Sequence, residues 1–198
     1  FDDTVPHGAG LSSSAAIEVA TAITLATLGN EAHGVRKEVD KVEMAIISQR
    51  AENRYVGVNC GIMDQFASAM GKADCAIFLD CKDLSYRLVP LNLKGYKIVI
   101  SNTNKKRSLA ASKYNERRSQ CEKGMEILKA SLPDKCCLGE ISYRQFKQHE
   151  HLITDKIIRK RVEHVISEDD RVLKSVEALS RNDIQEFGRL MIDSHNSL

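Results

Sequence analysis

The chain has 198 residues, 42% of them hydrophobic and 28% charged, and its 29 basic residues nearly balance its 27 acidic ones. This is enough apolar material for one ample domain or two small ones. The charge balance excludes the strong positive field that attracts nucleic acid or a membrane surface, and the chain has neither a long apolar run that predicts a membrane span nor the pattern of a secretion signal.

The first elements predicted along the chain are two helices. Apolar residues from Ala15 to Leu28 predict a mostly buried helix, which a Gly29-Asn30 pair is expected to end. A second helix is predicted from about Val35 to Asn53, because its apolar residues recur at helical spacing on one face.

A short helix and three strands are predicted next. Residues 60–70 have the pattern of a turn into a short helix, with Ile62, Phe66 and Ala69 facing inward. "CAIFLD" and "YRLVPL" predict a pair of strands, and "YKIVISN", residues 96–102, predicts a stronger strand.

The last part of the chain predicts long amphipathic helices over residues 109–131, 155–181 and 183–195, the first of them stopped by Pro133. The strand-rich middle separates two helical regions. We therefore expect two lobes, residues 1–93 and 94–198, with a boundary near Leu93–Gly95.

A glycine–serine turn, "VPHGAGLSSSAAIEVA" at residues 5–20, carries the chief functional signal. Glycines allow close approach of the backbone to a ligand, and serines that open a helix cap it and leave amide hydrogens pointing outward. These donors and the positive end of the helix dipole favour an anion such as phosphate. A Walker A loop is excluded because no lysine precedes Arg36, and a dinucleotide loop would need a glycine where Ser13 stands. A simple capped helix is the alternative.

The stretch from Pro6 to Ala16 resembles the second motif of the GHMP small-molecule kinases, whose ATP loop lies at a helix start. Residues 49–68, 101–122 and 164–198 are similar to segments of galactokinases, in the same order. The resemblance implies an α+β fold of two lobes, a GHMP-kinase-like fold incomplete at both ends. It also implies ATP-dependent phosphorylation of the C1 hydroxyl of galactose.

The resemblance also implies roles for individual residues. Asp64 is expected to face the sugar's anomeric hydroxyl as the catalytic residue, either accepting its proton or only orienting it. Ser14 and Glu52 are expected on Mg²⁺, with Gly61 and Tyr114 beside the sugar. The turn expected around the triphosphate of ATP comprises Pro6, Gly8, Ala9, Gly10, Leu11, Ser12, Ser13 and Ser14.

Each of these residues has a simpler interpretation. Glu52 can be a solvated carboxylate at a helix end, and Tyr114 an exposed helix tyrosine. Asp64 can be the N-cap of a helix over residues 65–70, a common role for aspartate. Four motifs in the family's order together favour the functional interpretation.

Two other functions remain open. The chain can belong to a related monosaccharide kinase, such as an N-acetylgalactosamine kinase, or to a galactose sensor that binds sugar and ATP without turnover. The intact run from Ser12 to Ala16 favours an enzyme. The family's first motif, with its Glu-His-x-Asp stretch, and its glycine-rich third motif are absent. The resemblance thus implies an internal piece of a longer kinase, with little activity alone and with unpaired sheet edges.

The remaining polar clusters predict no further site. The six cysteines form no CxxC pair and are expected to be free thiols of a cytoplasmic protein. The basic clusters at residues 105–107 and 117–118 lack interleaved aromatic residues, so nucleic acid is not expected as a partner. His149 and His151 do not share a helix face, which argues against a metal site.

Overall fold

The computed structural model describes residues 4–6, 9–102 and 110–198, with side chains in the last stretch from residue 113 onward. The chain forms two compact units. The first comprises Phe1–Leu88 and Lys94–Ala111, and the second Val89–Leu93 and Ser112–Leu198. The lobes expected at residues 1–93 and 94–198 stay a prediction.

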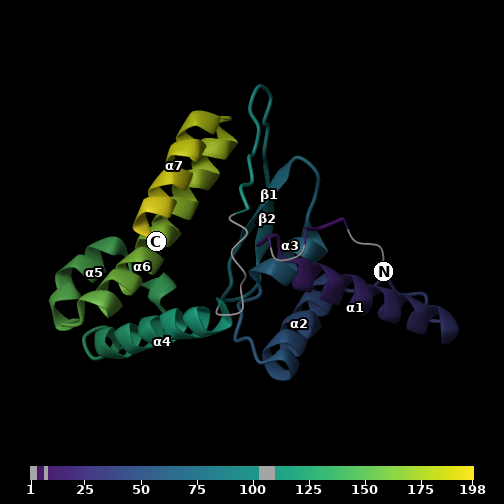
Figure 1. Ribbon diagram of the computed structural model, residues 1–198, viewed down its shortest axis with the longest axis horizontal. Helices are drawn as coiled ribbons and strands as arrows, with labels where there is room; N and C mark the ends of the chain where they lie inside the picture. Colours follow the sequence, from purple (N-terminus) through teal and green to yellow (C-terminus); the bar gives the residue numbers. More distant parts are fainter. Residues whose placement is uncertain (1–3, 7–8, 103–109) are drawn as a thin grey trace. The chain divides into compact units, whose positions relative to one another are not determined.

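Helices dominate the described residues, and a single two-stranded sheet accompanies them (Figure 1). In chain order the elements are α1 (Ser13–Ala32), α2 (Lys41–Ala51), η1 (Glu52–Val56), α3 (Met63–Met70), β1 (Cys75–Leu79), β2 (Tyr86–Pro90), α4 (Ala110–Lys129), η2 (Leu138–Glu140), α5 (Tyr143–His149), η3 (Glu150–Leu152), α6 (Lys156–Ser180) and α7 (Ile184–Ser197).

In the first unit, α1, α2 and α3 pack against one another (Figure 1). Small residues, Val19, Ala45 and Ala69, form the contact between the three helices. The prediction for residues 60–70 is confirmed, because Ile62, Phe66 and Ala69 are all buried. The ring of Phe66 also meets Tyr86 edge-to-face, at 5.2 Å between centroids.

The prediction for the first helix is wrong in two respects. The helix continues through Gly29 to Ala32, and Gly34 ends it with a φ of 66°. The Val35 amide then donates to the Asn30 carbonyl at 2.8 Å, which closes the last turn. The helix is also far from buried, since Leu25 is 66% exposed. Its apolar residues do have helical spacing, but only Ala15 and Val19 of this helix are buried.

The second helix begins later than predicted, at Lys41, because the Asp40 carboxylate caps it by accepting from the amides of Val42 and Glu43. After Ala51 the backbone widens into η1, a π-helix that Gly57 ends with a φ of 83°. π-Helical turns are rare and frequently lie at functional sites. Here the turn begins at Glu52, the carboxylate singled out in the sequence.

The two strands predicted as a pair are confirmed as β1 and β2. The stronger strand predicted at residues 96–102 is wrong, because this segment forms no strand in the described part of the chain. Its side chains lie in the open, and Val99 is 82% exposed. A strand exists only when a neighbouring strand pairs with its backbone amides and carbonyls, which β-propensity alone does not supply.

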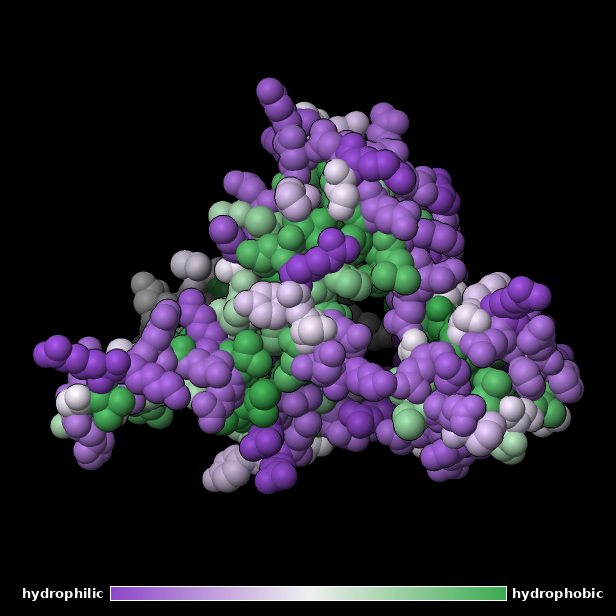
Figure 2. Space-filling view, turned by 180° about the vertical axis from the view of Figure 1, so that it is seen from behind, coloured by the Kyte–Doolittle hydropathy of each residue, from purple (hydrophilic) through white to green (hydrophobic). Residues whose placement is uncertain are grey.

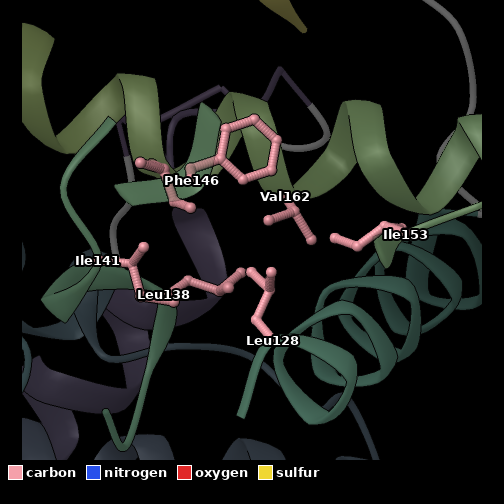
Figure 3. Packing of buried hydrophobic residues seen from close by; sticks show 7 residues of the cluster. Leu128, Leu138, Ile141, Phe146, Ile153 and Val162 are labelled. Atoms are coloured by element: carbon pink, nitrogen blue, oxygen red, sulfur yellow. The ribbon is translucent and has the colours of Figure 1, made fainter. Parts of the chain in front are cut away.

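The core of the second unit lies between α4, α5 and α6 and contains Leu128, Phe146 and Val162 (Figure 3). The predicted helix at residues 109–131 is confirmed as α4. The sequence did not predict α5. This helix begins with a capping box, in which Ser142 and Gln145 each bond the other's backbone.

The two C-terminal helices, α6 and α7, lie side by side (Figure 1) and confirm the predicted ranges to within two residues. On α6, Val162, Val176 and Leu179 are buried, but Leu173 is 52% exposed. His164 joins the helices, with 2.9 Å between its Nδ1 and the Ser197 hydroxyl oxygen.

Acid is expected to destabilise the second unit through His164. Burial lowers the pKa of His164 below its usual 6.5, and Arg171, Arg161 and Arg117 lower it further. The unfolded chain therefore takes up a proton first as the pH falls, so stability drops below about pH 6.5. The melting temperature, followed from about pH 8 to 5, should fall less for His164→Gln than for the unmodified chain. Parallel profiles would contradict this assignment.

The surface carries apolar side chains among charged ones (Figure 2). No helix in the described residues is both long and apolar enough to cross a membrane. All six cysteines are free thiols, as predicted.

Candidate active site

The glycine–serine turn leads into α1 through two left-handed residues. Gly10 has a φ of 81° and Ser12 a φ of 59°, and the Ala9 amide donates to the Pro6 carbonyl at 3.4 Å. A non-glycine residue with positive φ is strained, and such strain gathers at functional sites. Of the expected triphosphate residues, Gly8 lies outside the described residues.

The prediction that a serine side chain caps α1 is wrong. Ser12 occupies the N-cap position, but its side chain makes no capping hydrogen bond. The first amides of α1 therefore have no side-chain cap, since the left-handed backbone of Ser12 replaces the extended conformation usual at an N-cap. This arrangement leaves amide donors at the positive end of the helix dipole, where an anion is favoured.

Glu52 lies opposite this turn. The Ser14 hydroxyl donates to Glu52 Oε1 at 3.4 Å, across 38 residues of chain. Gln65 Nε2 donates to the other carboxylate oxygen, Oε2, at 2.9 Å. Glu52 is thus held by two neighbouring side chains, which favours a role in this site over a freely solvated carboxylate. The structure brings together the two residues expected on a cation.

Two further residues of this site were not predicted. Gln65 is only 1% exposed, and its Nε2 also donates to Glu18 Oε2 at 3.2 Å. Burial raises the pKa of Glu18, and the Glu52 carboxylate raises it further. Gln65 lies on the same helix face as Ile62, Phe66 and Ala69, all of which are buried. A polar residue on a predicted apolar face was the signal that could have identified it.

Asp64 is exposed and lies in the first turn of α3, directly before Gln65. Its interpretation as an N-cap is wrong, because the helix begins at Met63 and Ile62 is the N-cap residue. The carboxylate is therefore not engaged in capping this helix. An acidic group in a first turn is stabilised by the helix dipole.

The two residues expected beside the sugar lie in different units. Gly61 is exposed and precedes α3 in the first unit, whereas Tyr114 lies on α4 in the second unit and is 46% exposed. Their place beside a sugar stays a prediction. Within the described part of the chain, no three His, Cys, Asp or Glu side chains are grouped as metal ligands. A cation at Ser14 and Glu52 would therefore rely on few protein ligands.

Comparison with known proteins identifies similar chains. Residues 1–72 match the family model of the GHMP kinases N terminal domain. The whole chain is 48% identical to a galactokinase of Clostridium acetobutylicum and 49% identical to one of Fusobacterium nucleatum subsp. nucleatum, covering 49% of each.

The fold matches as well. The structure of Lactococcus lactis galactokinase complexed with galactose superimposes with a TM-score of 0.90 and 39% sequence identity, over 98% of this chain and 48% of that one. The chain thus spans about half the length of the relatives that it matches. The α+β fold expected from the resemblance is confirmed, and the chain is similar to galactokinases along its whole length, with residues 1–72 matching the GHMP kinase family.

Proposed function

We propose that the protein carrying this chain transfers the γ-phosphoryl group of ATP to the C1 hydroxyl of galactose. The observation that carries the proposal is the hydrogen bond from Ser14, at the start of α1, to Glu52, 38 residues away. It places a carboxylate beside amides that favour phosphate. The relatives at 48–49% identity are galactokinases, and the Lactococcus lactis structure holds galactose.

The turn from Pro6 to Ser14 would receive the triphosphate of ATP. Its glycine at positive φ and the uncapped amides of α1 suit close approach of phosphate oxygens. Ser14 and Glu52 would hold Mg²⁺, because a hydroxyl and a carboxylate are the hard oxygen ligands that this ion prefers. The residues fit such an ion, since no basic side chain in the described residues forms an ion pair with Glu52. When bound, the ion would neutralise charge on the phosphate oxygens.

Asp64 would act on the sugar. Its carboxylate is exposed and follows Gly61 by three residues, so it is free to reach a hydroxyl group brought to this end of α3. There it would accept the proton of the C1 hydroxyl group or orient that hydroxyl for attack. Orienting the hydroxyl would align the nucleophile with the phosphoryl group, and accepting its proton would make it a stronger nucleophile. The proposal includes a cytoplasmic location, which the free thiols suit.

Release of ADP tests the proposal. The protein that carries this chain, given ATP and Mg²⁺, is expected to release ADP with galactose and much less with N-acetylgalactosamine or glucose. Turnover with N-acetylgalactosamine alone would assign it to the related monosaccharide kinases. Binding of galactose and ATP without ADP release would identify a sensor, and absence of nucleotide binding would contradict every version of the proposal.

A further inference from the structure

We propose that Gln65 is a positioning residue of this site: its carboxamide fixes the Glu52 carboxylate in the orientation that faces Ser14, and Glu18 locks the carboxamide in place. The inference rests on the proposed function, because it assumes that Ser14 and Glu52 hold a cation beside a nucleotide. It adds two residues, Gln65 and Glu18, to the ones that the sequence pointed to.

The hydrogen bonds of Gln65 define one orientation of its carboxamide. Nε2 carries two hydrogens, and each goes to a different carboxylate: Glu52 Oε2 at 2.9 Å and Glu18 Oε2 at 3.2 Å. A flip of the amide would bring Oε1, an acceptor, against two acceptors. Two carboxylates thus hold the amide in one state, and the amide in turn holds Glu52 by one oxygen while the Ser14 hydroxyl contacts the other.

The oxygen of the carboxamide, Oε1, lies where it lowers the stability of the fold. Gln65 Oε1 is buried and has no hydrogen-bond partner in the described residues. An unpaired buried polar atom is destabilising, and an apolar side chain of the same size would avoid that cost. A methionine would also match the apolar neighbours of Gln65 on α3. The hydrogen bonds that Nε2 donates therefore explain a glutamine at this buried position better than packing does.

Electrostatics also requires a group that holds the two carboxylates together. Glu18 and Glu52 repel each other, and neither takes part in an ion pair among the residues described. Without the shared amide, Glu52 would gain by turning outward to water. The two N–H bonds to charged acceptors offset part of this repulsion, since such bonds are stronger than neutral ones. Gln65 thus maintains a negative site to which no described basic side chain is paired.

The test compares Gln65→Met with Gln49→Met in the protein that carries this chain. Gln65→Met keeps the volume and removes both donors, and we expect it to weaken binding of Mn²⁺ with a non-hydrolysable ATP analogue by about 10-fold or more, measured by electron paramagnetic resonance. Gln49→Met removes an amide that donates to the Cys60 backbone carbonyl at 3.3 Å, so it should leave Mn²⁺ affinity unchanged. Melting temperatures report any general loss of stability.

A double-mutant cycle separates positioning from a merely structural role. In a Glu52→Gln background the carboxylate to be positioned is gone, so adding Gln65→Met should not weaken Mn²⁺ binding further. Equal weakening in both backgrounds overturns the inference, as does an unchanged affinity in the single variant. If Gln65→Met fails to fold, Gln65→Asn replaces it with the same expectation, since its shorter side chain cannot reach both carboxylates. Failure of the unmodified protein to bind Mn²⁺ and the analogue overturns the proposed function itself.

Discussion

Replacing Asp64 with asparagine is expected to lower kcat for galactose phosphorylation by about 10²–10⁴-fold in the protein that carries this chain. The amide keeps the size of the side chain but cannot accept the proton of the C1 hydroxyl, and it orients that hydroxyl less strongly. Because Asp64 is exposed, the change should leave the fold intact. The KM for ATP should change little, since the glycine–serine turn, the proposed ATP site, leads into α1, whereas Asp64 lies on α3. Steady-state ADP release at saturating galactose measures the effect.

Asp74→Asn is the matched control for this variant. Asp74 is also exposed in the first unit, in the turn after α3, and its φ of 56° suits asparagine as well as aspartate. Asp74 lies neither in the glycine–serine turn nor at the start of α3, so its replacement should leave kcat the same. If Asp64→Asn retains the kcat of the unmodified protein, Asp64 is not the catalytic residue, whatever the resemblance implies.

The helix start after the glycine–serine turn and the short helix α3 are the features near the site that the sequence located correctly, although the predicted serine cap is absent. Both depend on local signals: glycines and serines before an apolar run, and apolar residues at helical spacing. Glu52 and Ser14 were paired by resemblance to the kinases and not by pattern, because 38 residues separate them. The periodicity of a single sequence cannot indicate that the Glu52 carboxylate contacts the start of a helix 38 residues earlier in the chain.

The predictions that are wrong concern segments whose burial or strand pairing depends on another element of the chain. The apolar side chains of α1 were expected inside, yet Leu25 is 66% exposed, because apolar spacing shows which face could be buried and not whether another element covers it. Residues 96–102 have strand composition but no neighbouring strand in the described chain. Gln65 was not predicted, because the prediction for residues 60–70 rested on its apolar residues alone, and the partners of Gln65, Glu18 and Glu52, are distant in the sequence.

The contact between α4 and α6 supplies the prediction with the largest effect on stability. Gly124→Ala is expected to lower the free energy of unfolding of the second unit by about 2–3 kcal/mol. A Cβ at this position would overlap Val162 Cγ2 and stand 3.2 Å from Ile158 Cγ2. Val162 is fully buried and β-branched, so its side chain cannot rotate away, and α4 and α6 would have to separate.

Gly188→Ala in α7 is expected to have the opposite effect on the stability of the same unit. Nothing lies within 4 Å of a Cβ built there, so the substitution only removes backbone freedom from the unfolded chain. It should raise the free energy of unfolding by about 0.5–1 kcal/mol, the usual difference between alanine and glycine inside a helix. Urea denaturation followed by circular dichroism measures both variants. Because both replace a helical glycine, a similar shift in the two would show that helix propensity, and not the close approach of α4 to Val162, decides the stability of this unit.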